Sequence, residues 1–163
     1  MLPESTLAEA AALLAELQAR GATLATAESC TGGLIAAALT AIAGSSATVL
    51  AGYVTYANEA KMRMVGVPAA MLAAQGAVSA PVAQQMAEGA RSDAGATLAI
   101  SCTGIAGPGG AMPGKPIGLV FIGCAREGHP TLVERHVFPG DRTAVRAATV
   151  AAAFSLIRRA LLT

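Results

Sequence analysis

Two short apolar runs of this chain end in the same four residues, Ser-Cys-Thr-Gly, and this repeat constrains the fold more than any other feature. One run, at 22–28, leads into the copy at 29–32, and the other, at 96–102, overlaps the copy at 101–104. Short apolar runs followed by glycine are typical of buried strands. Ligands of open α/β sheets gather beyond the carboxyl ends of the strands, so we expect two turns that face each other across one crevice if their strands are parallel neighbours.

Segments with helical periodicity lie between the strand-like runs and predict an α/β fold. We expect helices at 5–21, 31–44, 58–66, 68–76, 79–93 and 142–162, and further strands at 47–57, 116–125 and 131–138. The last two strands are close enough in sequence to form a hairpin. Strands that alternate with helices, followed by a hairpin and a final helix, predict a mixed sheet covered by helices.

Several helix starts carry residues that can satisfy the free backbone N–H groups there. Thr6 and Glu9 have the spacing of a capping box in the first helix. Asn58, Ser79 and Asp141 are expected as N-cap residues of three later helices. These assignments predict where each helix begins.

Length and composition favour one small-molecule-binding domain, residues 1–163, over other classes. The chain has 163 residues, a net charge of +1 and only 3% aromatic residues, so neither a basic surface nor a base-stacking platform for nucleic acid is expected. Its apolar runs are shorter than the roughly 20 residues of a membrane span. Its start lacks a basic signal-peptide region, which predicts a cytoplasmic location.

The cysteines and histidines do not have the spacing of a metal site. Cys30, Cys102 and Cys124 are an odd number, as expected of reduced thiols, and His129 and His136 lie near a turn and in a strand. We therefore expect no metal and no cofactor.

Ser29 is the strongest candidate for a catalytic role, and two interpretations of this residue stay open. It can cap the helix that follows, or it can act as a nucleophile. No histidine lies near any motif, so the base would be Lys61, with Tyr56 relaying a proton or orienting the amine. Only two of the eleven basic residues are lysine. Cys30 is a second candidate nucleophile, because a helix N-terminus lowers thiol pKa values.

The loop at 104–116 is rich in glycine and proline, as binding loops often are. Its backbone N–H groups could form a nest for phosphate, with charge from Lys115 or Arg142; in the plainer interpretation it is a crossover turn. Glu28, if buried, needs a partner and could orient a polar group of the ligand.

Six segments in order resemble the CinA C-terminal domain family, and in particular the stand-alone PncC-type nicotinamide-nucleotide amidases. The resemblance runs from about Gly21 to the last helix. The segments are TAESCTGG, GSSATVLAGYVTYANEAKMRMVGV, GAVSAPVAQQMAEGAR, TGIAGPGG, KPIGLVFIG and GDR.

This resemblance implies hydrolysis of the carboxamide of nicotinamide mononucleotide to nicotinic acid mononucleotide and ammonia, in pyridine-nucleotide recycling. It further implies a three-layer α/β/α sandwich around a mixed, mainly parallel sheet, no catalytic metal, and a homodimer or higher homo-oligomer. The family's serine nucleophile, lysine base and tyrosine fall on Ser29, Lys61 and Tyr56. We expect the substrate to be bound by Glu28, Cys30, Thr31, Gly32, Thr103, Gly104, Gly107, Gly109, Lys115 and Arg142.

Two positions depart from the usual pattern of the family. Residues 111–114 read Ala-Met-Pro-Gly where relatives carry small polar or acidic residues, and Ala80 stands where an acidic residue is common. Two other functions stay open on the sequence: a catalytically silent nucleotide- or phosphate-binding module, and an amidohydrolase that uses Cys30.

Overall fold

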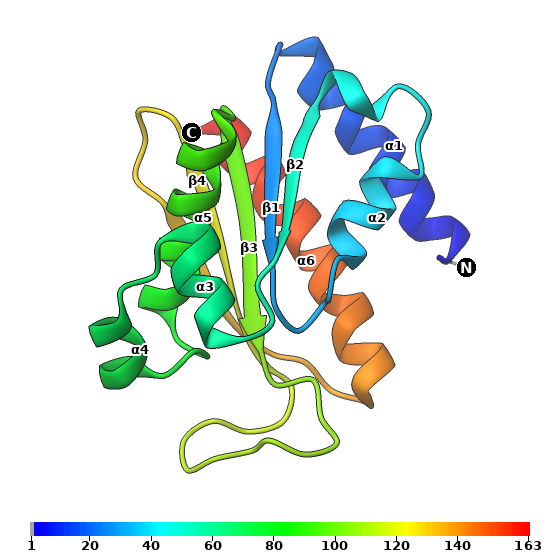
Figure 1. The fold of residues 1–163 in the computed structure, drawn as a ribbon. Coiled ribbons are helices and arrows are strands. Elements are labelled where there is room, and N and C mark those ends of the chain that lie inside the picture. The colour runs from blue at the N-terminus through cyan, green and yellow to red at the C-terminus, as the bar shows by residue number, and fades with distance from the viewer. Residues whose placement is uncertain (1) are drawn as a thin grey trace.

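The computed structural model describes residues 2–163 and is built around one five-stranded sheet (Figure 1). The strand order is β2-β1-β3-β4-β5. Strand β1 pairs in parallel with β2 and β3, whereas β4 is antiparallel to β3 and β5. The strands are β1 (Leu24–Glu28), β2 (Val49–Val54), β3 (Leu98–Gly104), β4 (Leu119–Arg126) and β5 (Leu132–Val137).

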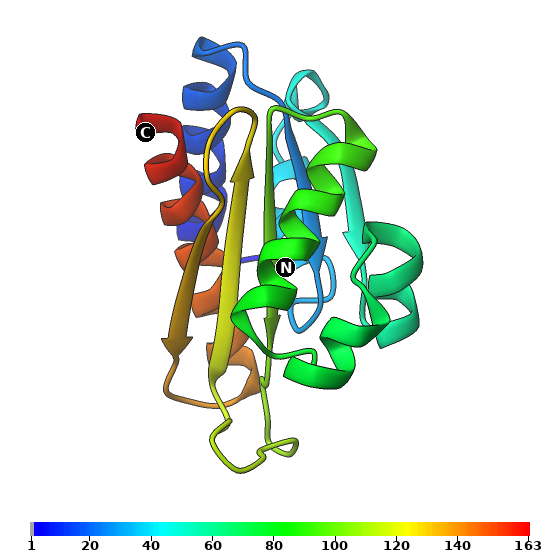
Figure 2. The ribbon, with the colours of Figure 1, turned by 90° about the vertical axis from the view of Figure 1, so that its left-hand side faces the viewer.

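Helices cover both faces of the sheet and make it the middle of three layers (Figures 1 and 2). Helices α1, α2 and α6 lie on one face, and α3, α4 and α5 lie on the other. The helices are α1 (Glu4–Ala19), α2 (Leu34–Thr40), α3 (Asn58–Val65), α4 (Ala69–Gln75), α5 (Ala80–Ala94) and α6 (Arg142–Leu162), with a 3-10 turn at Ser45–Ala47. The predicted α/β class with a mixed sheet is therefore confirmed.

The core consists of two apolar clusters, one on each side of the sheet. The larger cluster joins α1, α2 and α6 to the sheet and holds mostly leucine, isoleucine and valine. The smaller cluster lies under α3 and α5, where alanines of β1 and β3 let the helices approach closely. Full burial of one large aliphatic side chain contributes about 1.5–3 kcal/mol. No helix within residues 2–163 combines the length and the hydropathy needed to cross a membrane.

The predicted helix starts are only partly right. Helix α1 begins at Glu4 with Pro3 as its N-cap residue, so Thr6 and Glu9 lie inside the helix and the predicted capping box is wrong. Because proline presets the backbone angle of a first turn, the helix can begin earlier than the Thr-x-x-Glu spacing suggested.

The other three predicted caps have different outcomes. Asp141 caps α6, accepting a hydrogen bond from the amide of Ala144 at 2.9 Å. Ser79 occupies the N-cap position of α5, but its hydroxyl donates to the Gly76 carbonyl at 2.8 Å. Asn58 is the first residue of α3 rather than its cap.

The two Ser-Cys-Thr-Gly copies are not equivalent in space, so the prediction of two facing turns is wrong. Strands β1 and β3 are parallel neighbours, as expected, but Glu28 pairs with Cys102 in their register. The first copy therefore follows β1 as a turn, while the second forms the last four residues of β3. The turn is joined to this strand by a hydrogen bond from the Ser29 amide to the Cys102 carbonyl, at 3.0 Å.

Candidate active site

The turn at 29–33 connects the end of β1 to the start of α2. Its last two residues, Gly32 and Gly33, have φ angles of 61° and 103°, in the left-handed region that favours glycine. Gly33 is the N-cap residue of α2 and has no side chain to cap it. The interpretation in which Ser29 serves as the helix cap is therefore wrong.

The carboxylate of Glu28 caps α2 instead. One of its oxygens, Oε2, accepts hydrogen bonds from the amides of Gly33 and Ile35 at 3.1 and 3.0 Å and from the Thr31 hydroxyl at 2.5 Å. The other, Oε1, accepts from the amide of Ala36 at 2.9 Å. Because the side chain is fully buried and each contact is a donor to it, we assign Glu28 to holding the turn rather than to the substrate.

Lys61 lies in the first turn of α3, with its amine beside the hydroxyl of Ser29. The Nζ atom is 3.0 Å from Ser29 Oγ, 2.7 Å from the Thr55 carbonyl oxygen and 3.3 Å from that of Tyr56. Burial lowers the pKa of Lys61 from its ordinary 10.5. A neutral amine has two N–H bonds and one lone pair. With the two carbonyls accepting the N–H bonds, the lone pair is left for the Ser29 hydroxyl.

Ser29 is the less deeply buried member of this pair. It is 9% exposed, whereas Lys61 is 1% exposed and is among the largest fully buried side chains of the protein. The amine is therefore shielded from bulk water. Shielding favours the uncharged amine, which is the form that can accept a proton.

Cys30 and Cys102 lie next to the pair and are both buried. The pKa of Cys30 is lowered, chiefly by its contact with the neighbouring Cys102 and against the effect of burial. Cys30 belongs to the larger apolar cluster and is 6% exposed. Within the described residues, no three histidine, cysteine or acidic side chains come together as metal ligands.

Tyr56 and Arg142 connect three segments around the turn. The side chain of Tyr56 is exposed, and its hydroxyl accepts a hydrogen bond from Arg142 Nη2 at 3.0 Å. The other guanidinium nitrogen, Nη1, donates to the carbonyl of Gly107 at 3.1 Å. The structure thus brings together the segment before α3, the glycine-rich loop and the start of α6.

Other predicted binding residues lie further along the same loop or in β3. The Thr103 hydroxyl is buried and donates to the Ala77 carbonyl at 2.8 Å, and Gly104 ends β3. Gly109 faces open space. The amine of Lys115 binds the carbonyl of Gln75, at the end of α4, at 2.8 Å, so it supports the loop rather than the Ser29–Lys61 pair.

Arg146 is a residue at the site that sequence analysis missed. It lies one helical turn after Arg142 on α6, and its Nη2 donates to the Thr31 carbonyl at 3.0 Å. A side chain at Gly32 would lie 3.7 Å from this guanidinium group. Its Nε atom is buried and has no hydrogen-bond partner within residues 2–163. The four-residue spacing of the two arginines was the available signal, since such residues share a helix face.

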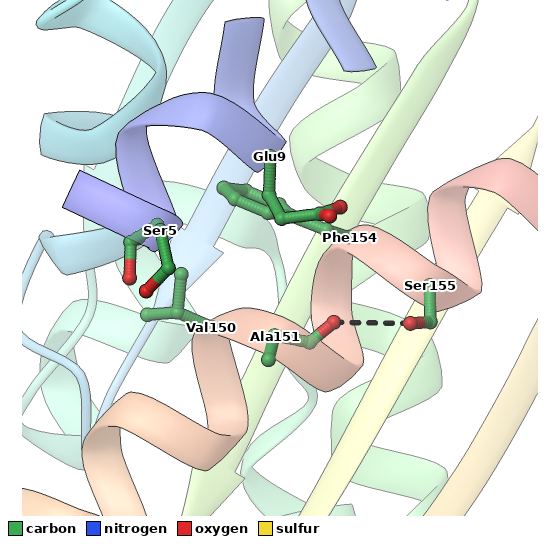
Figure 3. Close-up of a pocket in the computed structure, with 7 residues that line it drawn as sticks. Ser5, Glu9, Val150, Ala151, Phe154 and Ser155 are labelled. Carbon is green, nitrogen blue, oxygen red and sulfur yellow. Dashed lines mark hydrogen bonds between the residues drawn. The ribbon is translucent and has the colours of Figure 1, made fainter. Parts of the chain in front are cut away.

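A separate hollow of about 400 Å³ lies between α1 and α6 (Figure 3). It is lined by Ser5, Thr6, Glu9, Val150, Ala151, Phe154 and Ser155. Its Ser155 hydroxyl donates to the Ala151 carbonyl of its own helix, at 3.2 Å. None of the predicted site residues lines this hollow, so it is not part of the Ser29 site.

The fold and the site define an α/β/α domain with a serine–lysine pair where its first strand ends. The model of the CinA C-terminal domain matches residues 6–161, and the chain belongs to this family. It is 56% identical over 147 residues to a CinA-like protein of Citrifermentans bemidjiense and 54% identical over 144 residues to one of Geobacter sulfurreducens. These matches cover 90% and 88% of the chain, but only 35% of each relative's length.

Solved structures agree with this membership over nearly the whole fold. A competence/damage inducible protein, CihA, from Agrobacterium tumefaciens superposes with a TM-score of 0.94 at 42% identity, covering 98% of this chain and 97% of that one. A competence damage-inducible protein A, ComA, from Klebsiella pneumoniae gives 0.92 at 40% identity, covering 96% and 97%.

Proposed function

We propose that this chain hydrolyses the carboxamide of nicotinamide mononucleotide, giving nicotinic acid mononucleotide and ammonia. The observation that carries the proposal is the buried Lys61 amine, 3.0 Å from Ser29 Oγ, with its pKa lowered by burial. A base whose pKa is lowered and which contacts the hydroxyl is what nucleophilic serine requires. The resemblance to nicotinamide-nucleotide amidases provides the substrate.

The proposed reaction has two halves that use the same base. Ser29 Oγ attacks the amide carbon while Lys61 takes the hydroxyl proton, and Lys61 then gives this proton to the departing ammonia. Water next attacks the acyl-enzyme, passing a proton to Lys61, and the amine returns it to Ser29 as the acid leaves. The sum is one amide and one water converted to one acid and one ammonia, without a metal or cofactor.

Backbone N–H groups of the turn are candidates for stabilising the tetrahedral intermediate. Within residues 2–163, the amides of Cys30 and Thr31 donate no hydrogen bond to another residue. Two free donors next to the nucleophile suit a developing oxyanion. We expect the 5′-phosphate near Arg142 and the Gly107 segment, and we retain homo-oligomeric assembly and a cytoplasmic location as predictions.

An ammonia-release assay tests the function directly. We expect release from nicotinamide mononucleotide, and slower release from nicotinamide riboside and free nicotinamide, because these lack the phosphate. A silent binding module would instead raise the melting temperature with the nucleotide and liberate no ammonia. That result would contradict the proposal.

The lowered pKa of Cys30 supports one alternative, an amidohydrolase with a cysteine nucleophile. We expect Cys30→Ala to keep turnover within about threefold of the unmodified chain, since a residue outside the chemistry contributes little to it. The measurement is the rate of ammonia release, compared with that of Ser29→Ala. An inactive Cys30→Ala beside an active Ser29→Ala would transfer the nucleophile to the thiol.

A further inference from the structure

Three buried side chains behind the nucleophile form a line of hydrogen bonds. Counting the donors and acceptors along this line locates its protons. Thr31 Oγ1 lies 2.5 Å from Glu28 Oε2 and 3.0 Å from Cys102 Sγ. The hydroxyl has one proton, and a carboxylate oxygen can only accept, so Thr31 donates to Glu28. The thiol of Cys102 must then donate to Thr31.

The Cys102 thiol keeps its proton. Its pKa is raised well above the ordinary value by its contact with Cys30 and by burial. The line therefore runs from the Cys102 thiol through the Thr31 hydroxyl to the Glu28 carboxylate. All three side chains are at most 1% exposed, so water does not compete for these hydrogen bonds.

The line holds the turn at several points around Ser29. Glu28 precedes the serine and anchors the start of α2, while the Cys102 carbonyl accepts the Ser29 amide at 3.0 Å. Inside the turn, the Gly32 amide donates to the Ser29 carbonyl at 3.0 Å. A nucleophile displaced by about 1 Å from its base can lose about 100-fold in rate.

We propose that Glu28, Thr31 and Cys102 form a positioning network that holds the Ser29 hydroxyl against the Lys61 amine. The proposal rests on the proposed function of that pair. Within residues 2–163, none of the three side chains hydrogen-bonds to Lys61 Nζ, whose partners are the Ser29 hydroxyl and the carbonyls of Thr55 and Tyr56. They are positioning residues, and their removal should slow the chemistry without changing the groups that perform it.

The chain offers a matched control for the central link. Thr26 is a fully buried threonine of β1, and its hydroxyl has no hydrogen-bond partner in the part of the chain that the structure describes. Thr31→Val and Thr26→Val make the same change in shape and polarity, but only the first breaks the line. Thr31→Ser keeps a hydroxyl and should rescue the loss.

The test uses two readouts, of which one does not depend on the natural substrate. We would measure kcat and KM for ammonia release from nicotinamide mononucleotide, and the rate at which a fluorophosphonate labels Ser29. Thr31→Val should lower both kcat and the labelling rate about tenfold, with KM within about twofold and the midpoint of the pH profile unchanged. Thr31→Ser and Thr26→Val should stay within about threefold of the unmodified chain on both readouts.

If Thr31→Val does not fold, the outer link provides a second test. Cys102→Ala should slow labelling several-fold, and Cys102→Ser should restore it, because a hydroxyl can also donate to Thr31. Cys124→Ala is the matched control, since this thiol is equally buried but lies outside the line.

Three outcomes would overturn the positioning network: unchanged labelling and kcat in Thr31→Val, equal losses in Thr31→Val and Thr26→Val, or a change in KM alone. Labelling that falls in Thr31→Val while the unmodified chain releases no ammonia would support the network and refute the proposed substrate. An unmodified chain that is never labelled at Ser29 would refute both.

Discussion

The two Ser-Cys-Thr-Gly segments have identical residues and different surroundings. In the first, Ser29 lies in a turn and is 9% exposed, with its hydroxyl 3.0 Å from Lys61 Nζ. In the second, Ser101 lies within β3, fully buried, and its hydroxyl donates to the Ala83 carbonyl of α5 at 2.6 Å. One serine meets an amine and the other an acceptor, so only the first can be made nucleophilic.

The difference comes from the register between β1 and β3. Glu28 pairs with Cys102, which places the second copy two residues further back along the sheet than the first. The second copy is therefore paired with β4 and covered by α5, while the first lies beyond the carboxyl end of β1. In the proposed mechanism, the same short sequence therefore acts only at the strand end, where a helix and a turn can meet it.

Replacing each serine by alanine should affect activity in one case and stability in the other. The loss of activity is the largest change that we expect. Ser29→Ala should lower turnover by at least about 100-fold, because the nucleophile is lost. Ser101→Ala should keep turnover within about threefold but lower the free energy of unfolding by about 0.5–1.5 kcal/mol, because one buried hydrogen bond to the Ala83 carbonyl is lost. Ammonia release and urea denaturation measure the two effects.

A fully active Ser29→Ala would contradict the serine mechanism. A Ser101→Ala variant that is stable but inactive would show instead that the two copies share a chemical role.

Replacing Lys61 by arginine tests whether the amine acts as a base or only as a positive charge. Arginine keeps its proton in proteins, so Lys61→Arg should be nearly as slow as Lys61→Ala, at least about 100-fold below the unmodified chain. Arg63→Lys, an exposed change on the same helix, is the control for effects on α3. The readout is kcat for ammonia release, and an active Lys61→Arg would remove the lysine from the proton transfer.

The pH dependence of stability provides a smaller, complementary test of the lowered pKa of Lys61. Burial lowers the pKa of Lys61 in the folded chain from the ordinary value of 10.5. Between the two pKa values the unfolded chain binds more protons, so the free energy of unfolding rises with pH. The difference between the unmodified chain and Lys61→Met should therefore grow with pH up to the unfolded value, by at most about 1.4 kcal/mol per pH unit.

Urea denaturation of both chains at several pH values between neutral and the ordinary lysine pKa measures this difference. The other titrating groups are common to both chains and largely cancel. A difference that does not vary with pH would mean that the folded chain keeps Lys61 charged, which excludes it as a base near neutral pH.

Much of the fold could be predicted because the periodicity of local segments decides it. The alternating strands and helices, the final hairpin and the Asp141 cap all follow from short-range patterns, and all are present. The predicted capping box at Thr6 was wrong, and of the two interpretations of Ser29 the helix cap was wrong. Proline at position 3 and the carboxylate of Glu28 provide the helix starts instead, and a side chain that caps from outside the usual position leaves no simple signal.

The candidate site was only partly visible in the sequence. The rarity of lysine and the absence of nearby histidine favoured Lys61 as the base, but its burial and its contact with Ser29 depend on how α3 packs against α5 and β2. Arg146 was missed because its neighbour Thr31 is 115 positions away in the chain. Glu28 and Thr31 were expected at the substrate, whereas their side chains hydrogen-bond to each other and, through Glu28, to the start of α2.

The sequence by itself determined which segments become strands and helices, because these depend on the spacing of apolar residues and on glycine and proline nearby. It also placed a serine and a lysine in separate segments. Tertiary structure alone decided the register of β1 against β3, and with it which serine meets the amine. Register and burial arise from packing between distant segments, and their effect on a pKa exists only once water has been excluded.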